Sequence, residues 1–116
     1  MSINYKNQGF KQTGTGKTTV LTCPIDGTII IKSIYCANND ASSAILVNMN
    51  FVDSSDSSTE YEFFRDDVAA KTQVNASPQG INLEAGDSIK IQSATASNKI
   101  QGVISYAQID RSQENG

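Results

Sequence analysis

The chain has 116 residues, enough for one domain, and its 9 basic and 12 acidic side chains give a net charge of −3. This mildly acidic balance argues against nucleic acid as a partner, and no apolar run approaches the ~20 residues that a bilayer span needs. The chain has no histidine, which removes the side chain most often used for proton transfer near neutral pH and a common metal ligand.

The composition favours β structure with an uncharged polar surface. Ser, Thr, Asn and Gln make up 41 of the 116 residues, whereas charged residues make up 18%. Ile and Val together number 19 and Leu only 3, and β-branched side chains suit a pleated sheet better than a helix. We therefore expect an all-β domain with a small core and help from subunit contacts.

Residues 1–16 are polar and contain few apolar anchors, among them Tyr5 and Phe10. We expect them to form an extended arm that is free to pack on a neighbouring subunit. Within this segment, Gly14-Thr-Gly-Lys-Thr18 resembles the end of a phosphate-binding loop. The first glycine of that motif would fall on Lys11, and a β-prone run follows where the motif needs a helix. We therefore expect no nucleotide site.

From Lys17 onward, short β-prone runs alternate with turn signals such as Pro24-Ile-Asp-Gly27 and Glu84-Ala-Gly-Asp87. In the second turn, Gly86 is expected to take a positive φ. We predict strands at residues 18–23, 28–37, 44–52, 59–68, 72–75, 81–83, 88–93 and 100–109. Seven or eight strands at this spacing predict a single antiparallel β-sandwich over residues 17–110, with jelly-roll or immunoglobulin-like topology, followed by a flexible tail at 111–116.

Two apolar patterns bear on the core. The run Ile29-Ile30-Ile31 breaks strict alternation, which indicates burial on both faces or a bulge. Alternation in the next strand puts Ile45, Val47, Met49 and Phe51 on one face. We expect that face to pack against the Ile89 and Ile91 face of a second sheet.

The two thiols, Cys23 and Cys36, do not have zinc-ligand spacing. We expect both to be reduced and buried on neighbouring strands, with a disulfide across adjacent strands as the alternative. The acids from Asp53 to Glu62 lack the glycine and the spacing of a calcium loop. We therefore expect no metal, no cofactor and no enzymatic activity.

An ordered set of motifs resembles small β-sandwich structural proteins in the virions of tailed bacteriophages, especially marine and cyanobacterial ones. The set covers roughly residues 17–110 and consists of Thr18-Thr-Val-Leu-Thr-Cys-Pro24, Gly27-Thr-Ile-Ile-Ile-Lys-Ser-Ile34, Cys36-Ala-Asn38, Leu83-Glu-Ala-Gly-Asp-Ser-Ile-Lys-Ile91 and Val103-Ile-Ser-Tyr-Ala-Gln-Ile109. One departure is Cys23-Pro-Ile-Asp-Gly27, where a Pro-Ala-Gly-like turn is expected. The resemblance implies a capsid decoration or neck/collar subunit, or alternatively a tail or fibre subunit, and carries over no catalytic residues.

This resemblance implies other virion proteins, and further copies of the chain, as partners. The N-terminus lacks a secretory signal pattern, so we expect synthesis in a host cytoplasm and a final place in the virion. Loops and arms are where a rigid sandwich presents its contacts. The expected contact residues are Tyr5, Phe10, Asn38, Asn39, Asp53, Asp56, Ser97 and Asn98. The rival hypothesis is a carbohydrate-binding module that stacks sugars on Tyr5, Tyr35, Tyr61 or Tyr106.

Overall fold

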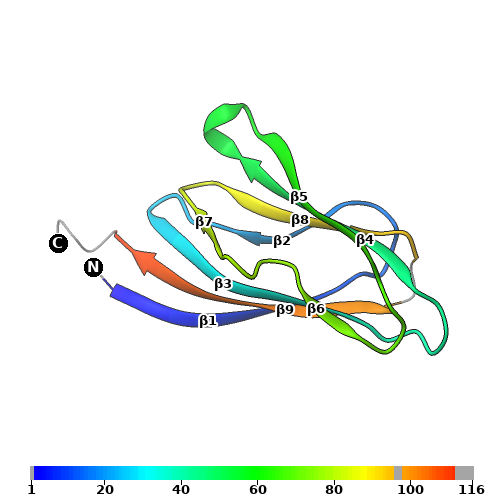
Figure 1. The fold of residues 1–116 in the computed structure, drawn as a ribbon. Coiled ribbons are helices and arrows are strands. Elements are labelled where there is room, and N and C mark those ends of the chain that lie inside the picture. The colour runs from blue at the N-terminus through cyan, green and yellow to red at the C-terminus, as the bar shows by residue number, and fades with distance from the viewer. Residues whose placement is uncertain (1, 96–97, 112–116) are drawn as a thin grey trace.

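The computed structural model describes residues 2–95 and 98–111. Within these residues, nine strands form two antiparallel sheets that pack face to face (Figure 1), which confirms the predicted β-sandwich. The strands are β1 (Ser2–Lys11), β2 (Thr18–Thr22), β3 (Gly27–Asn38), β4 (Ile45–Asp53), β5 (Thr59–Val68), β6 (Gln73–Asn75), β7 (Ile81–Leu83), β8 (Ser88–Ser93) and β9 (Ile100–Asp110). No helix among the described residues has the length and apolar character needed to cross a membrane.

The strand order identifies a jelly roll. One sheet, which we call sheet A, has the order β1-β9-β3-β6, with β7 also paired to β3, and the other, sheet B, has the order β2-β8-β4-β5. Each of the first four strands therefore lies in the opposite sheet from the one before it. In an immunoglobulin fold the first two strands share a sheet, so that alternative is excluded. The three-residue strands β6 and β7 together fill the last position of sheet A.

The core lies between the two sheets, but its pairing differs from the prediction. Met49 is the cross-strand partner of Ile91 and Phe51 that of Ile89, so these residues share one face of sheet B and do not oppose each other. The opposing face belongs to β3 and β9. Its fully buried members are Ile29, Ile31, Ile34, Cys36, Ile100 and Ile104.

Register shifts explain where simple alternation fails. Ile29 and Ile31 are buried while Ile30 points outward, so alternation holds through this run, and the bulge comes just after it, between Ile31 and Ser33. A second shift lies opposite Met49 and Asn50, which pair with Phe64 and Glu62. The extra residue there is Phe63, and this lets both Phe63 and Phe64 pack against the core.

The N-terminal segment differs from the expected arm. Ser2–Lys11 is strand β1, and it pairs with β9 in unbroken register from Ser2 opposite Asp110 to Lys11 opposite Gln101. Its side chains are exposed on both faces except for the half-buried Ser2 and Phe10. Backbone pairing with β9 holds this strand in its own subunit. Such pairing does not need alternating apolar side chains, so the sequence shows no pattern that marks the strand.

Strands β4 and β5 form a hairpin that rises above the sandwich, with the short 3-10 helix Ser54–Asp56 at its tip (Figure 1). The buried Asp87 carboxylate holds the start of this tip. It accepts hydrogen bonds from the Ser54 backbone N–H and hydroxyl, both at 3.0 Å, and from the Glu84 N–H at 2.9 Å. Gly86 takes the expected positive φ of 84° in the turn before Asp87.

Candidate assembly surface

The outward face of sheet A carries an apolar row. In-register partners on neighbouring strands point to the same face, so Tyr5, Ala107 and Ile30 lie side by side across β1, β9 and β3. Ile3 and Ile109 form a second cross-strand pair on the same face, nearer the chain ends. The most exposed members of this face are Tyr5 at 77%, Ile3 at 51%, Tyr35 at 44% and Ile30 at 41%.

Ile3, Tyr5 and Ile30 in this row are three of the six large hydrophobic side chains that are exposed in the described part of the chain. Tyr35 lies on the same face but is separated from the row by the polar cross-strand residues Asn7, Ser105 and Ser33, and Ile25 and Tyr61 lie elsewhere. The Lys32 ammonium lies 5.5 Å from the centre of the Tyr5 ring, so a cation borders the row. Contiguous exposed apolar surface of this kind is typical of a contact site. Of the predicted contact residues, Tyr5 lies in this row.

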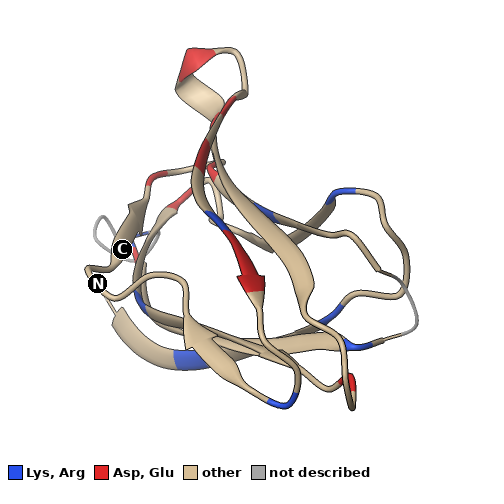
Figure 2. Ribbon diagram, turned by 45° about the vertical axis from the view of Figure 1, so that its right-hand side comes forward, with Lys and Arg blue, Asp and Glu red and all other residues tan. Residues whose placement is uncertain are grey.

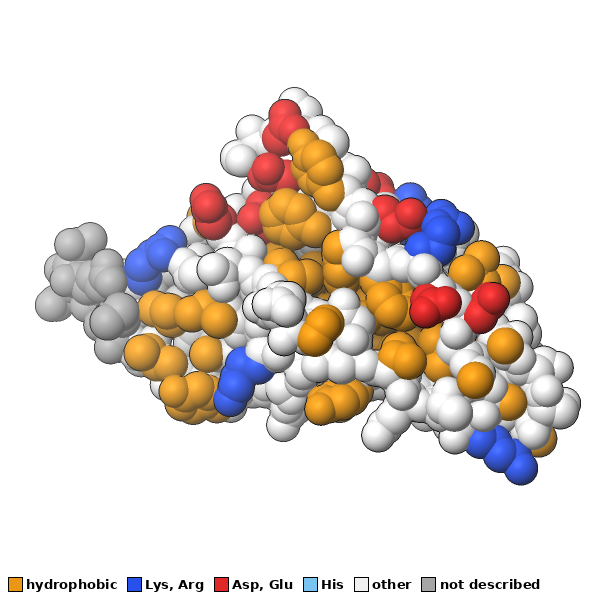
Figure 3. Space-filling model, viewed as in Figure 1, with side chains coloured by type: hydrophobic (Ala, Val, Ile, Leu, Met, Phe, Trp, Pro, Cys, Tyr) orange, Lys and Arg blue, Asp and Glu red, His pale blue; other side chains and the backbone are white. Residues whose placement is uncertain are grey.

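A second apolar site lies on the raised hairpin. The rings of Phe51 and Tyr61 stack with centroids 6.4 Å apart, and Phe63 and Phe64 further along β5 are half-buried. Figure 3 shows hydrophobic side chains on the flank beneath the hairpin with acids beside them. The Tyr61 hydroxyl donates to Asp56 at 2.8 Å, and this carboxylate raises the pKa of Tyr61.

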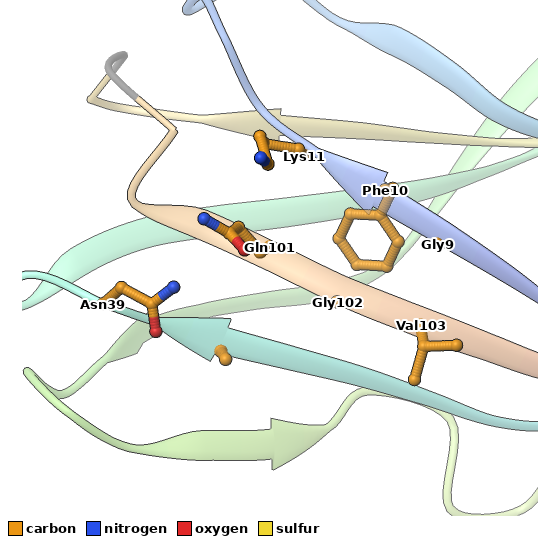
Figure 4. Close-up of a pocket in the computed structure, with 8 residues that line it drawn as sticks. Gly9, Phe10, Lys11, Asn39, Gln101, Gly102 and Val103 are labelled. Atoms are coloured by element: carbon orange, nitrogen blue, oxygen red, sulfur yellow. The ribbon is translucent and has the colours of Figure 1, made fainter.

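Phe10 borders a shallow depression on sheet A that is lined by residues from β1, β3 and β9 (Figure 4). Its ring lies against Gly102, where a Cβ would come within 2.5 Å of the ring and 2.0 Å of the Tyr35 carbonyl oxygen. Phe10 packs against the core from there. The half-buried Phe10 ring therefore contributes to the packing of its own subunit.

Asn38 is not a contact residue. Its side chain is buried, and its amide nitrogen donates to the carbonyls of Ser43 at 2.9 Å and Val68 at 2.8 Å. Its side-chain oxygen accepts from the Asp40 N–H at 2.8 Å. These hydrogen bonds connect the end of β3 to the β3–β4 loop and to β5. Asn38 therefore stabilises the fold, whereas we expected it to be an exposed contact residue.

The remaining predicted contact residues lie at two separate places. Asn39 and Asn98 are exposed at the same end of the molecule, since the Asn39 N–H donates to Lys99 and the Asn98 N–H to Gln12. Asp53 caps the short helix at the hairpin tip by accepting from the Ser55 N–H at 3.1 Å, and Asp56 binds Tyr61. Ser97 lies outside the described residues. The predicted set thus does not form one surface.

The long open strands of the two sheets carry opposite charge. β1 and β5 are each ten residues long, and each is the edge strand of its sheet. β1 carries Lys6 and Lys11 and no acid, whereas β5 carries four acids and one arginine. Figure 2 shows acidic residues along the β4–β5 hairpin and a basic position on β1. The other edges are short: β2 has five residues and β6 and β7 have three each.

The described residues hold no group of three or more acidic or thiol side chains placed to bind a metal ion. Cys23 follows β2, and its Sγ lies 3.4 Å from the Gly27 carbonyl at the start of β3, whereas Cys36 lies near the other end of β3. Nine residues of strand separate Gly27 from Cys36, roughly 30 Å, and a disulfide needs Cα atoms within about 7 Å. The two cysteines are free and buried, but they are not neighbours, so the disulfide alternative is wrong for this chain.

Neither the apolar row nor the pairing of β1 with β9 is predicted by the local sequence patterns. The signal for the row was the central Ile30 of the isoleucine run together with Ala107 and Ile109, but seeing it requires the register of β1 and β9 on β3. That register joins residues about a chain length apart, and no local pattern reports it.

Neither a protein-family model nor a curated protein matches this sequence. Two solved structures share its fold. One is a chain of the disulfide-linked pili of Bacillus endospore appendages: it is 12% identical, the match covers 96% of this chain and 90% of that one, and the TM-score is 0.55. The other is a chain of the T13 IBDV viral particle: it is 8% identical, the match covers 94% of this chain and 31% of that one, and the TM-score is 0.53. At these identities the likeness establishes the fold alone.

Proposed function

We propose that this chain is a non-enzymatic structural subunit that works by contact with other subunits, including copies of itself. The observation that carries the proposal is the apolar row of Tyr5, Ile30 and their neighbours on the outward face of sheet A. A stable, isolated domain gains nothing from four large exposed hydrophobic side chains on one face, whereas an interface buries them. The fold is shared with a pilus chain and a virus-particle chain, which agrees with such a role.

Within this proposal, the particular assembly is the virion of a tailed bacteriophage, with the chain as a capsid decoration or neck/collar subunit. The support is the ordered motif set over roughly residues 17–110, which resembles such proteins. A tail or fibre position is the alternative within the same class. Proteomics of purified virions, followed by imaging of the particle, tests this part. Finding the chain in infected cells but not in mature particles contradicts it.

The contact role is tested by polar substitution in the apolar row. We expect Tyr5→Ser with Ile30→Ser to weaken self-association, or incorporation into the particle, while the circular dichroism spectrum stays that of a β protein. The control is Ile25→Ser, because Ile25 is 82% exposed in the β2–β3 turn and does not occupy a strand position of the row. Sedimentation velocity over a range of concentrations measures the effect. Equal behaviour of both variants contradicts the proposal, and so does glycan binding by a monomer that Tyr5→Ala abolishes.

A further inference from the structure

The two long edge strands differ in how they are protected from pairing with other chains. An open edge presents a row of unpaired backbone N–H and C=O groups, and natural proteins usually blunt it by shortening it, bulging it or charging it. β2, β6 and β7 are short, and β5 carries five charged side chains and an extra residue at Phe63. β1 has none of these devices except two lysines, and its register with β9 is unbroken.

We propose that β1 of one copy adds to the open edge of β5 in the next copy, so that sheet A of one subunit continues into sheet B of its neighbour. The inference rests on the proposed function, because it adds an edge contact to the face contact through which copies of the chain associate. Both strands are ten residues long, so they can pair over most of their length, with the extra residue Phe63 of β5 left unpaired. The pairing satisfies the outward backbone groups of both edges at once.

Charge favours this pairing over its alternatives. Two β5 strands side by side would bring Glu60, Glu62, Asp66 and Asp67 of each copy together, and two β1 strands would bring Lys6 and Lys11 of each together. Like charges on facing strands are destabilising and opposite charges are favourable. The basic edge of β1 is therefore the partner that this chain itself supplies for the acidic edge of β5.

Some of the carboxylates on β5 form ion pairs within the subunit and others do not. Glu62 binds Arg65 at 2.7 Å, and Glu60 binds Lys17 at 3.0 Å and Lys90 at 3.2 Å. Asp66 and Asp67 at the end of β5 are exposed, and no ion pair joins either of them to a described basic side chain. These two acids are the best placed to receive Lys6 or Lys11 of a neighbour.

The contact joins two different surfaces, the β1 edge of one copy and the β5 edge of the next, and this determines its symmetry. Each copy offers one β1 edge and one β5 edge, so the interface is head-to-tail and every copy can bind two neighbours. Contacts of this kind close into a ring or continue as a filament. They do not stop at a dimer, which is a second observable consequence.

Cross-linking maps the contact directly. A mixture of unlabelled and ¹⁵N-labelled chains is allowed to associate and is treated with a carbodiimide, which joins amines to carboxylates that touch. We expect peptides of mixed isotope content that link Lys6 or Lys11 to Asp66, Asp67 or Glu62. Associated copies whose mixed links all lie elsewhere overturn the edge contact and leave a self-associating subunit intact.

Charge reversal tests the same contact by function. We expect K6E/K11E and D66K/D67K each to weaken self-association at least about tenfold, because like charges then face each other. The chain with all four changes should regain association, while K71E/K99E, which changes the net charge as K6E/K11E does, should leave it unchanged. Loss in K71E/K99E as well, or no rescue by the fourfold variant, overturns the inference. A wild-type chain that stays monomeric at every concentration refutes self-association itself.

Discussion

Gly102 occupies a position on β9 between two close neighbours, the Tyr35 carbonyl oxygen on β3 and the Phe10 ring on β1. A Cβ at this site would overlap both, at 2.0 Å and 2.5 Å. The absent side chain thus allows three strands of sheet A to approach one another at the level where Phe10 reaches the core. The sequence signals only a glycine in a strand, which weakens a strand unless something packs against it.

Replacing Gly102 with alanine should destabilise the fold. The added methyl group must displace backbone on one side and an aromatic ring on the other, and overpacking of this kind costs about 1–3 kcal/mol. Urea denaturation followed by fluorescence or circular dichroism measures the change in the free energy of unfolding. Gly9→Ala is the matched control, because a Cβ on Gly9 meets only the Gly102 carbonyl oxygen, at 3.9 Å. An equal loss in both variants would show that the close packing is not the cause.

Both thiols should be unreactive in the folded protein. Burial raises the pKa of Cys36 to about 11 and also raises that of Cys23, so neither is a thiolate at neutral pH. We expect iodoacetamide to alkylate them only after denaturation, as read by intact-mass spectrometry. On a non-reducing gel the chain should run as a monomer. A disulfide-linked ladder would contradict this expectation.

At the scale of elements, the raised hairpin depends on Asp87. This buried carboxylate accepts three hydrogen bonds that join the start of the hairpin tip to the turn between β7 and β8. Asp87→Asn replaces one acceptor oxygen with a donor, so the N–H of Ser54 or of Glu84 then faces another donor. We expect a loss of about 1–3 kcal/mol in the free energy of unfolding. Asp66→Asn is the control on an exposed strand position and should change stability little; a comparable loss there would contradict the argument.

A cluster of charges ties the strands of sheet B together on their outward side. Glu60 on β5 binds Lys90 on β8 and Lys17 next to β2, and it accepts from the Asn50 side chain on β4 at 3.1 Å. The two lysines lower the pKa of Glu60. Because the folded pKa lies below that of the unfolded chain, the stabilisation is present at neutral pH and is lost as the pH falls through the folded value.

Glu60→Gln should therefore reduce stability at neutral pH and much less in acid. Denaturant titrations of the wild type and the variant at both pH values test this, because the gap between the two proteins should narrow as Glu60 takes up its proton. The gap should also shrink in high salt, since the groups are exposed. Glu84→Gln serves as the control for loss of an exposed carboxylate outside the cluster. A gap that widens in acid would refute the assigned role.

At the scale of the whole molecule, the sequence predicted the fold class and eight of the nine strands within a residue or two. Alternation over Ile45 to Phe51 and turn residues such as Gly86 are local signals, and they located these strands. β1 was missed because its side chains are exposed on both faces, so no periodicity marks it. The strand order was open because it depends on pairings such as Ser2 with Asp110, which no local pattern encodes.

The candidate surface could be predicted less well, for a related reason. Loop residues were expected to contact partner subunits, but the Asn38 side chain makes its hydrogen bonds within its own chain. The apolar row consists of outward positions on three strands, and each position by itself resembles an ordinary exposed side chain. Only Tyr5 was selected from the sequence and also lies in the row. A surface formed by residues from several strands can be predicted only when the order and register of those strands are known.

The antiparallel pairing of Ser2 with Asp110 brings the first and last described strands together at one pole. A short peptide bridge can therefore join them, and the polypeptide can be reopened at the exposed Pro78–Gln79 turn between β6 and β7. We expect such a circular permutant to refold with an unchanged circular dichroism spectrum; failure to refold would show that β1 must be made first. A reporter joined beside Ser2 or beside Asp110 would lie at that same pole, leaving the opposite pole unobstructed.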